Sequence, residues 1–220
     1  ITMFIILFLG LAVVLLVGLV NAEKTEQPKR ILAFKIPLSL LFIVAWALQP
    51  AHNEVFSGLI LIALVFCLGG DILLALGTRI TFLCGLVSFL LGHVMYAAAF
   101  FVVGQIGPPM AVGAIVLAVS ATLVWRWLEG HLGSMKVPVL AYIVVISIMV
   151  CGACGTAANP AIPDYARATI LIGAILFYLS DLFVARQRFV VGAQINRTLG
   201  LPLYYTAQFL LAFSAAWIPG

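Results

Sequence analysis

The chain has 220 residues, of which 65% are hydrophobic and only 8% are charged, and its mean hydropathy is +1.26. Soluble domains carry about 25% charged residues, so the 11 basic and 7 acidic side chains present are too few to cover a water-facing surface of this size. This composition excludes a soluble globular enzyme, a nucleic-acid-binding protein and a disordered chain, and it predicts an integral membrane protein. The net charge of +4 requires no acidic partner, because basic loops that set membrane topology explain it.

Eight apolar runs follow one another along the chain, with short connections between them. Each is close to the about 20 residues that a helix needs to cross the hydrocarbon core. The sequence therefore predicts one all-α transmembrane domain over residues 1–220, built as a bundle of eight transmembrane helices. The first run exceeds the length of a signal-peptide core, and a positive loop follows it rather than precedes it, so we expect a retained helix. The predicted spans cover residues 2–20, 31–48, 55–76, 80–103, 108–127, 137–155, 166–185 and 199–217.

Lysine and arginine residues lie almost entirely on one side of this predicted bundle. All but one fall in or beside the odd-numbered loops, and only Arg167 lies on the other side. Because cytoplasmic loops are enriched in positive charge, we expect the odd-numbered loops to be cytoplasmic and both termini to lie on the non-cytoplasmic side. The short loops favour a bacterial inner membrane, and an endoplasmic-reticulum location stays open.

The cysteines and histidines do not form a metal-binding pattern. Cys151 and Cys154 have the spacing of a redox dithiol, but cysteines inside apolar runs usually behave as small hydrophobic residues. The three histidines lie on separate segments, and the chain has no His-Glu-x-x-His motif or array of cysteine pairs. We therefore expect no metal site.

Two aspartates inside apolar runs are the main functional candidates. Asp71 lies in the third predicted helix and Asp181 in the seventh. A carboxylate within a membrane is costly and typically marks a functional site. Asp71 precedes Arg79 by eight residues and Asp181 precedes Arg186 by five, so both should lie about 8–12 Å from the cytoplasmic end of their helices. A structural ion pair with Lys35 would account for one of the two carboxylates and would leave the other without a structural explanation. We therefore predict that the aspartates are functional.

The spacing of the two aspartates also suggests an internal repeat. They are 110 residues apart, which is half the chain, and the segment 70–75 (GDILLA) aligns with the segment 180–185 (SDLFVA). A 4+4 parallel repeat would bring the two carboxylates to symmetric positions across a central cleft.

Other polar side chains occur at similar depth, and most have a structural interpretation beside the functional one. Lys35 could neutralise charge or extend to the lipid headgroups. Tyr204 and Tyr205 could line a site or belong to an interfacial belt. Gln208 and His93 could act on a substrate or form hydrogen bonds between helices. The candidate substrate-binding residues are Lys35, His93, Tyr142, Ser180, Tyr204, Tyr205 and Gln208.

Two carboxylates in a low dielectric cannot both ionise cheaply, so one should be protonated and the other charged. Such an acid and base suit cleavage of an acetal-like or vinyl-ether bond, where protonation creates an oxocarbenium ion that water captures. Ester hydrolysis fits less well, because the Gly-x-Ser-x-Gly nucleophile motif is absent. Two classes remain, an intramembrane hydrolase acting on a lipid and a proton-coupled transporter that uses the aspartates as relays.

Broken helices would favour the transporter. Pro37, Pro138 and Pro202 are expected near helix starts, where proline is tolerated, so the sequence predicts no broken helix.

A set of short motifs, in order from about residue 30 to 214, resembles the YhhN family of membrane proteins, the lysoplasmalogenases. No single motif is specific, but the combination is, and it involves six of the predicted helices. The matching pieces are KIP at 35–37, GD at 70–71, GLVSFLLGHVMY at 85–96, PVLAY at 138–142, Met149, GA at 173–174, FYLSD at 177–181, RF at 188–189 and PLYYTAQ at 202–208.

This resemblance implies hydrolysis of the sn-1 vinyl-ether bond of lysoplasmalogen, giving a fatty aldehyde and glycerophosphocholine or glycerophosphoethanolamine. It implies an eight-helix fold, no cofactor, and a lysophospholipid and bilayer lipids as partners, with no nucleic acid. Asp71 and Asp181 would be the acid–base pair, with the choice of acid left open. Lys35 would neutralise charge or bind phosphate, and His93 would line the chain tunnel or tune the pair. The Tyr204, Tyr205 and Gln208 cluster would orient water or glycerol.

Overall fold

The computed structural model describes residues 2–220, with side chains from residue 7 onward, and within this range all regular secondary structure is helical. The expected all-α architecture is confirmed, and each predicted span corresponds to a helix. The helices are α1 (Thr2–Glu23), α2 (Pro28–Ala47), α3 (Glu54–Ala75), α4 (Arg79–Val103), α5 (Pro108–Leu128), α6 (Lys136–Ala157), α7 (Asp164–Ala185) and α8 (Gln194–Ser214). A short 3-10 turn, η1 (Gly133–Met135), precedes α6, and a π-helical turn, η2 (Arg186–Val190), extends α7.

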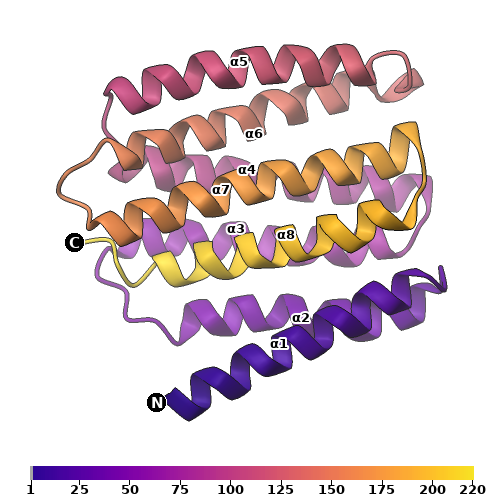
Figure 1. The fold of residues 1–220 in the computed structure, drawn as a ribbon, viewed down its shortest axis with the longest axis horizontal. Coiled ribbons are helices and arrows are strands. Elements are labelled where there is room, and N and C mark those ends of the chain that lie inside the picture. Colours follow the sequence, from indigo (N-terminus) through magenta and orange to yellow (C-terminus); the bar gives the residue numbers. More distant parts are fainter. Residues whose placement is uncertain (1) are drawn as a thin grey trace.

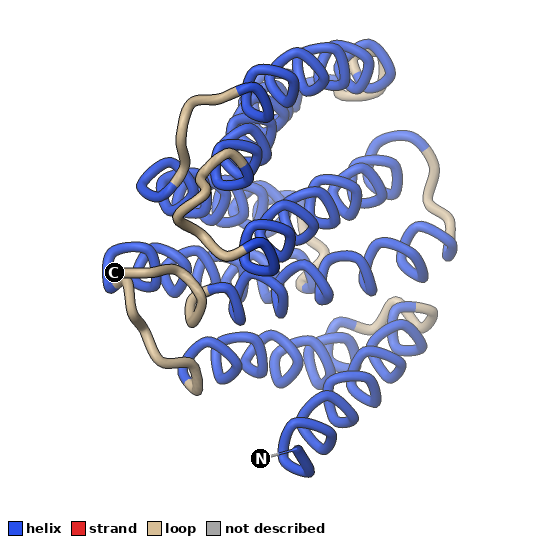
Figure 2. The backbone as a smooth tube through the Cα atoms, turned by 60° about the vertical axis from the view of Figure 1, so that its left-hand side comes forward, coloured by secondary structure: helices blue, strands red, loops and turns tan. Residues whose placement is uncertain are grey.

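The helices run back and forth in one bundle, with both termini at the same end and the loops after α1, α5 and α7 at the other (Figure 1). The most extensive interfaces join α3 to α4 and α7 to α8. Helix α2 packs on both α3 and α8, and α6 packs on α4, α5 and α7. Loops account for little of the described chain (Figure 2). The polar side chains inside the bundle are therefore positioned by helices.

Local signals explain where four of the helices begin. Proline occupies the first position of α2 (Pro28) and of α5 (Pro108), where its missing N–H removes no intrahelical bond. Asn53 caps α3 through its side chain, and Thr78 and Thr81 form a reciprocal capping box at the start of α4. The predicted bounds of α2 to α7 accordingly lie within three residues of those observed.

Helix α8 differs most from its prediction, because it begins at Gln194 rather than at residue 199 and ends at Ser214. The extra first turn contains Asn196, which is 2% exposed and donates hydrogen bonds to the Gln187 side chain at 2.8 Å and to the Val191 carbonyl at 2.9 Å. These tertiary hydrogen bonds stabilise a polar helical turn that a search for apolar runs does not detect.

The expectation that all three prolines lie near helix starts was wrong for two of them. Pro138 is in the first turn of α6, but Pro37 and Pro202 are inside α2 and α8. The reason is that both helices begin earlier than expected, at Pro28 and Gln194. Both helices nevertheless continue past their prolines without a break.

Six helices, α2 to α7, are long and apolar enough to cross a membrane by length and composition, counted over the described residues. In α1 the searched part, Leu7–Glu23, forms a shorter apolar helix, and α8 is not among the six. Many outward-facing side chains are large and apolar, and α5 buries only Leu117 and Leu128 of its 21 residues. The chain is a helical membrane protein with several membrane-spanning helices.

Candidate functional site

One cavity of about 590 Å³ lies inside the bundle, near the end that carries the loops after α1 and α7. Both Asp71 and Asp181 line it, as do Lys35, Tyr142, Ser180 and Tyr204. These side chains come from α2, α3, α6, α7 and α8. The structure therefore brings most of the predicted site residues to a single internal space.

Asp71 is surrounded by hydrogen-bond donors. Its Oδ2 accepts hydrogen bonds from Ser39 Oγ and Tyr204 Oη, both at 2.7 Å, and its Oδ1 lies 3.4 Å from Lys35 Nζ. Its exposed fraction is 2%. A buried charge requires a partner of opposite sign and further hydrogen bonds, and this set provides both for a carboxylate. Lys35 and Ser39 are four residues apart, on one face of α2.

A close contact between α3 and α4 fixes the position of Asp71. The preceding residue, Gly70, faces the Phe89 ring so closely that a Cβ atom would lie 2.5 Å from a ring carbon. Phe89 in turn makes edge contacts with the rings of Tyr204 and Phe177. The absence of a side chain at Gly70 therefore lets this aromatic cluster lie directly beside the carboxylate.

Asp181 has different partners. Its Oδ2 accepts a hydrogen bond from Tyr142 Oη at 2.7 Å and lies 3.5 Å from His93 Nε2, and its side chain is 16% exposed. No lysine or arginine forms an ion pair with it within the part of the chain whose side chains are described. The two carboxylates therefore share a cavity and have separate sets of partners.

The hydrogen bond on the other side of the His93 ring defines its tautomer. Nδ1 lies 2.7 Å from the carbonyl oxygen of Phe89, and because a carbonyl can only accept, Nδ1 must carry a hydrogen. In a neutral ring Nε2 then has a lone pair, and it faces Asp181 Oδ2. Nε2 is buried and makes no hydrogen bond with the described residues, and it lies 3.5 Å from Asp181 Oδ2. His93 therefore places a ring nitrogen that can accept a proton beside Asp181.

Three predicted site residues, His93, Tyr205 and Gln208, do not line the cavity. Tyr205 is within 3.1 Å of Ser39 Oγ, and since Ser39 donates to Asp71, the Tyr205 hydroxyl donates to Ser39. Gln208 accepts a hydrogen bond from Tyr96 at 2.6 Å. Tyr205 contacts two donors to Asp71, Ser39 through its hydroxyl and Tyr204 through its ring, whereas Gln208 is hydrogen-bonded to Tyr96.

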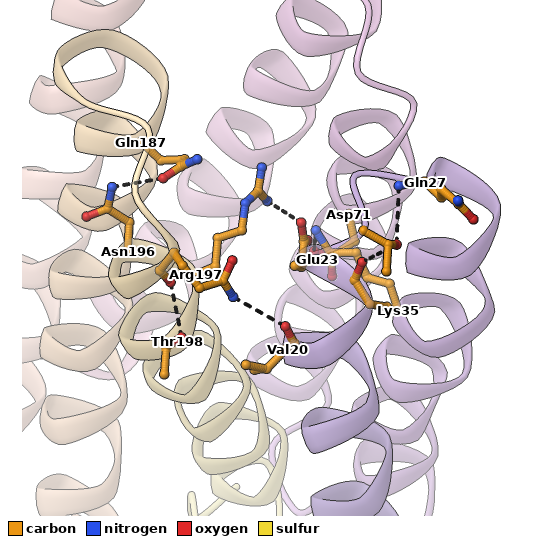
Figure 3. Close-up of polar contacts among 12 residues, drawn as sticks. Val20, Glu23, Gln27, Lys35, Asp71, Gln187, Asn196, Arg197 and Thr198 are labelled. Carbon is orange, nitrogen blue, oxygen red and sulfur yellow. Dashed lines mark hydrogen bonds and ion pairs between the residues drawn. The ribbon is translucent and has the colours of Figure 1, made fainter.

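The sequence prediction missed several cavity residues at the end of the bundle that carries the loops after α1 and α7, which we call the loop end. Glu23 is buried and forms an ion pair with Arg197 at 2.5 Å, which Figure 3 shows bridging α1 and α8. Arg188 lines the same part of the cavity. These charges were assigned to loops, where charge is ordinary, and no sequence pattern distinguished them. Ser39 was also missed as a partner of Asp71, although its position one turn after Lys35 is a usable signal.

The fold and this geometry define a class of protein, a helical membrane protein with two carboxylates at an internal cavity. Comparison then identifies the family. A model of the YhhN family matches residues 30–215, and the chain belongs to that family. The matched segment excludes α1, so the contribution of Glu23 to the cavity comes from outside it.

Curated relatives occur in bacteria and mammals. A Mycobacterium tuberculosis protein named "Lysoplasmalogenase" is 32% identical over 182 residues, covering 79% of this chain and 64% of the relative. The human protein "Lysoplasmalogenase TMEM86A" is 29% identical over 190 residues, covering 80% of this chain and 72% of the relative. The match thus spans 64% of the length of the mycobacterial protein. No solved structure matches the chain.

Proposed function

We propose that this protein is a lysoplasmalogenase, which hydrolyses the sn-1 vinyl-ether bond of a lysoplasmalogen to a fatty aldehyde and glycerophosphocholine or glycerophosphoethanolamine, without a cofactor. The observation that carries the proposal is that Asp71 and Asp181 line one cavity with different partners. Family membership and the names of the relatives support the substrate class. Since the mycobacterial relative is longer than this chain, its activity comes to this protein as part of the proposal.

Asp181 is the general acid in this mechanism. The protonated carboxyl group transfers its proton to the β-carbon of the vinyl ether, the Tyr142 hydrogen bond orients it, and His93 Nε2, 3.5 Å away, can exchange a proton with it. Protonation leaves an oxocarbenium ion at the carbon attached to the ether oxygen, and it leaves Asp181 as a carboxylate.

Asp71 is the general base. Its negative charge stabilises the oxocarbenium ion, and it accepts a proton from the water molecule that attacks that ion, which gives a hemiacetal. Lys35 and Tyr204 hold the Asp71 side chain in place and balance its charge before the reaction. The hemiacetal then collapses: Asp71 returns its proton to the glycerol oxygen, and Asp181 takes the hydroxyl proton. Both residues regain their starting state.

The remaining predicted residues have supporting roles. Ser180 lines the cavity and can contact the glycerol, whereas Tyr205 positions Asp71 through Ser39. Gln208 supports Tyr96 in the layer behind the site. In the membrane we propose that all eight helices lie in the bilayer, with the loops after α1, α3, α5 and α7 in the cytoplasm. The cavity would then open toward the cytoplasmic leaflet.

The test is aldehyde release by the purified protein in detergent, from a lysoplasmalogen and from its saturated alkyl-ether analogue. A saturated ether cannot form the oxocarbenium ion by protonation at carbon, so only the vinyl ether should react. Asp71→Asn and Asp181→Asn should each lower kcat by at least about 100-fold, the range typical of a lost general acid or base, while the protein remains folded.

Full activity in either variant would refute the assignment of that aspartate. Absence of aldehyde from wild-type protein shown to be folded would refute the hydrolase and favour the alternative, a proton-coupled transporter of lipids or small molecules. The transporter would then be tested directly by measuring whether uptake into proteoliposomes depends on a proton gradient.

A further inference from the structure

The cavity changes character toward the loops after α1 and α7. Its deeper wall is largely apolar apart from the site residues, whereas its loop end is polar. Figure 3 shows part of this end, where Arg197 and Glu23 lie in the same region as Lys35 and Asp71. We call the loop-end residues Glu23, Glu26, Gln187, Arg188 and Arg197 the polar rim. A cavity with an apolar interior, two carboxylates and a polar rim suits an amphiphile.

Arg188 is a positively charged rim residue without an ion-pair partner among the described side chains. Its guanidinium group lies over the Phe82 ring, 4.2 Å from the ring centre. Stacking of this kind occupies the face of the guanidinium plane and leaves the N–H groups at its edge free. Those N–H groups have the geometry that binds phosphate oxygens.

Arg197 is held at the rim by Glu23. The two form an ion pair at 2.5 Å in which the Glu23 side chain is 3% exposed and that of Arg197 is 38% exposed. An arginine side chain carries five N–H donors, so one contact with Glu23 fixes its position and leaves other donors available. The rim therefore has two arginine side chains, each oriented by a separate contact.

Each of the two arginines is separated from a site residue by the same number of residues in the sequence. Arg188 follows Asp181 by seven residues, and Arg197 precedes Tyr204, the donor to Asp71, by seven. From Arg197 to Tyr204 these seven residues of α8 correspond to about 10 Å, whereas Arg188 lies in η2, the π-helical turn that extends α7. Arginine side chains span part of this distance, and the glycerol backbone between the ether oxygen and the phosphate of a lysophospholipid spans the rest. Lys35 lies against Asp71 and is not needed for the phosphate.

We propose that Arg188 and Arg197 form the phosphate subsite, which binds the phosphodiester of a lysophospholipid at the rim while its sn-1 oxygen lies between the two aspartates. The proposal rests on the proposed function and deepens it, since it makes the phosphate a required part of the substrate. An alkenylglycerol without phosphate is then a poor substrate, although its vinyl ether is identical.

The test compares lysoplasmalogen with the matching alkenylglycerol, using wild-type protein and Arg188→Gln. Wild-type protein should prefer the phosphorylated lipid in kcat/KM. Arg188→Gln should raise KM for lysoplasmalogen by about ten-fold, as expected for a lost charged hydrogen bond, with kcat and the alkenylglycerol reaction little changed. Arg188→Lys should recover part of the loss, because it retains the charge.

Arg126→Gln is the matched control, since Arg126 lies at the same end of the bundle, in the last turn of α5, and does not line the cavity. It removes one surface charge and should leave KM unchanged. Equal KM increases for Arg188→Gln and Arg126→Gln would indicate general attraction of lipid to a basic surface and would overturn the proposal. An equal increase in KM of Arg188→Gln for lysoplasmalogen and for alkenylglycerol would also overturn the proposal.

Arg197→Gln leaves a buried carboxylate without its partner and can unfold the protein, so the double variant Glu23→Gln, Arg197→Gln is the better second test.

A binding assay separates this proposal from the catalytic one. The saturated alkyl-ether lysophospholipid should raise the thermal-unfolding midpoint of wild-type protein more than that of Arg188→Gln. Saturated alkylglycerol should shift the unfolding midpoints of wild-type protein and Arg188→Gln by the same amount. If the phosphorylated lipid stabilises wild-type protein more than Arg188→Gln but no aldehyde is released, the hydrolase is refuted and the subsite is retained. If it stabilises both proteins equally, the subsite is refuted.

Discussion

Asp71 and Asp181 are alike in the sequence and different in their surroundings. Each is a single carboxylate in an apolar helix, preceded by a small residue. Around Asp71 the structure has a lysine, a serine and a tyrosine, and around Asp181 it has a histidine and a tyrosine. This difference in partners, which the sequence did not reveal, is what distinguishes an acid from a base in the mechanism that we propose.

The position of His93 Nε2, 3.5 Å from Asp181 Oδ2, gives a prediction for His93. His93→Gln removes the ring nitrogen that faces the carboxyl group, and kcat for lysoplasmalogen should fall by about ten-fold or more while KM changes little. Single-turnover measurement of aldehyde formation tests this. His131→Gln makes the same change at an exposed histidine near the loop end and should have no effect. An unchanged kcat in His93→Gln would show that Asp181 acts without the histidine.

The sequence identified the polar residues that a membrane makes conspicuous. Asp71, Asp181, Lys35 and His93 stand out because an ionisable group in an apolar run is costly. Ser39 does not stand out, because serine satisfies its own hydroxyl within a helix at little cost. Its role in linking Tyr205 to Asp71 depends on how α2 packs against α3 and α8.

At the scale of helices, the contact between α3 and α4 at Gly70 supports the site. In Gly70→Ala the new methyl group would overlap the Phe89 ring, which packs against neighbouring rings and would have to shift toward the cavity that it lines. We expect a loss of about 1–3 kcal/mol of stability from overpacking and a fall in kcat, because Phe89 also contacts Tyr204.

Thermal unfolding and aldehyde release, measured on the same detergent preparation, test this prediction. Gly58→Ala is the matched control, since Gly58 is on the same helix and a Cβ atom there would have no neighbour within 4 Å. Its stability should be unchanged or slightly higher, because alanine favours helix more than glycine does. Similar losses in both variants would argue against a special contact at Gly70.

Helix bounds were predictable wherever a local signal marks them. Proline at the first position and capping side chains fix the starts of α2 to α5, and the apolar runs give the lengths. The start of α8 was not predictable, because the hydrogen bonds of Asn196 to Gln187 and Val191 come from a turn that follows α7. A π-helical turn such as η2 has no clear sequence signature, and turns of this kind often occur at functional sites.

At the scale of the whole molecule, the charge distribution predicts how the bundle is oriented in the membrane. Glu129 lies at the loop end and Ala161 at the end that carries the termini, and both are exposed. In a variant lacking the four native cysteines, a membrane-impermeant maleimide applied to intact cells should label Ala161→Cys and not Glu129→Cys. Permeabilised cells should label both, and the reverse pattern in intact cells would invert the proposed topology.

The class of fold followed from composition alone, because 8% charged residues leave few alternatives to a helical membrane protein. The number of membrane-spanning helices is harder to derive from composition. Helix α8 contains four polar residues that are buried inside the bundle, Asn196, Tyr204, Tyr205 and Gln208. A helix that buries polar groups in this way has low mean hydropathy even when it is surrounded by other helices. The internal repeat stays a prediction.

The ion pair between Lys35 and Asp71 also bears on the fate of an aldehyde formed in the cavity. Aldehydes condense with neutral amines to imines and add to thiols. Lys35 is the lysine that lines the cavity among the described residues, and none of the four cysteines does. An ammonium group held against a carboxylate has no lone pair to attack a carbonyl. The cavity wall is therefore chemically inert toward the product proposed for it, and the aldehyde can leave without modifying the protein that formed it.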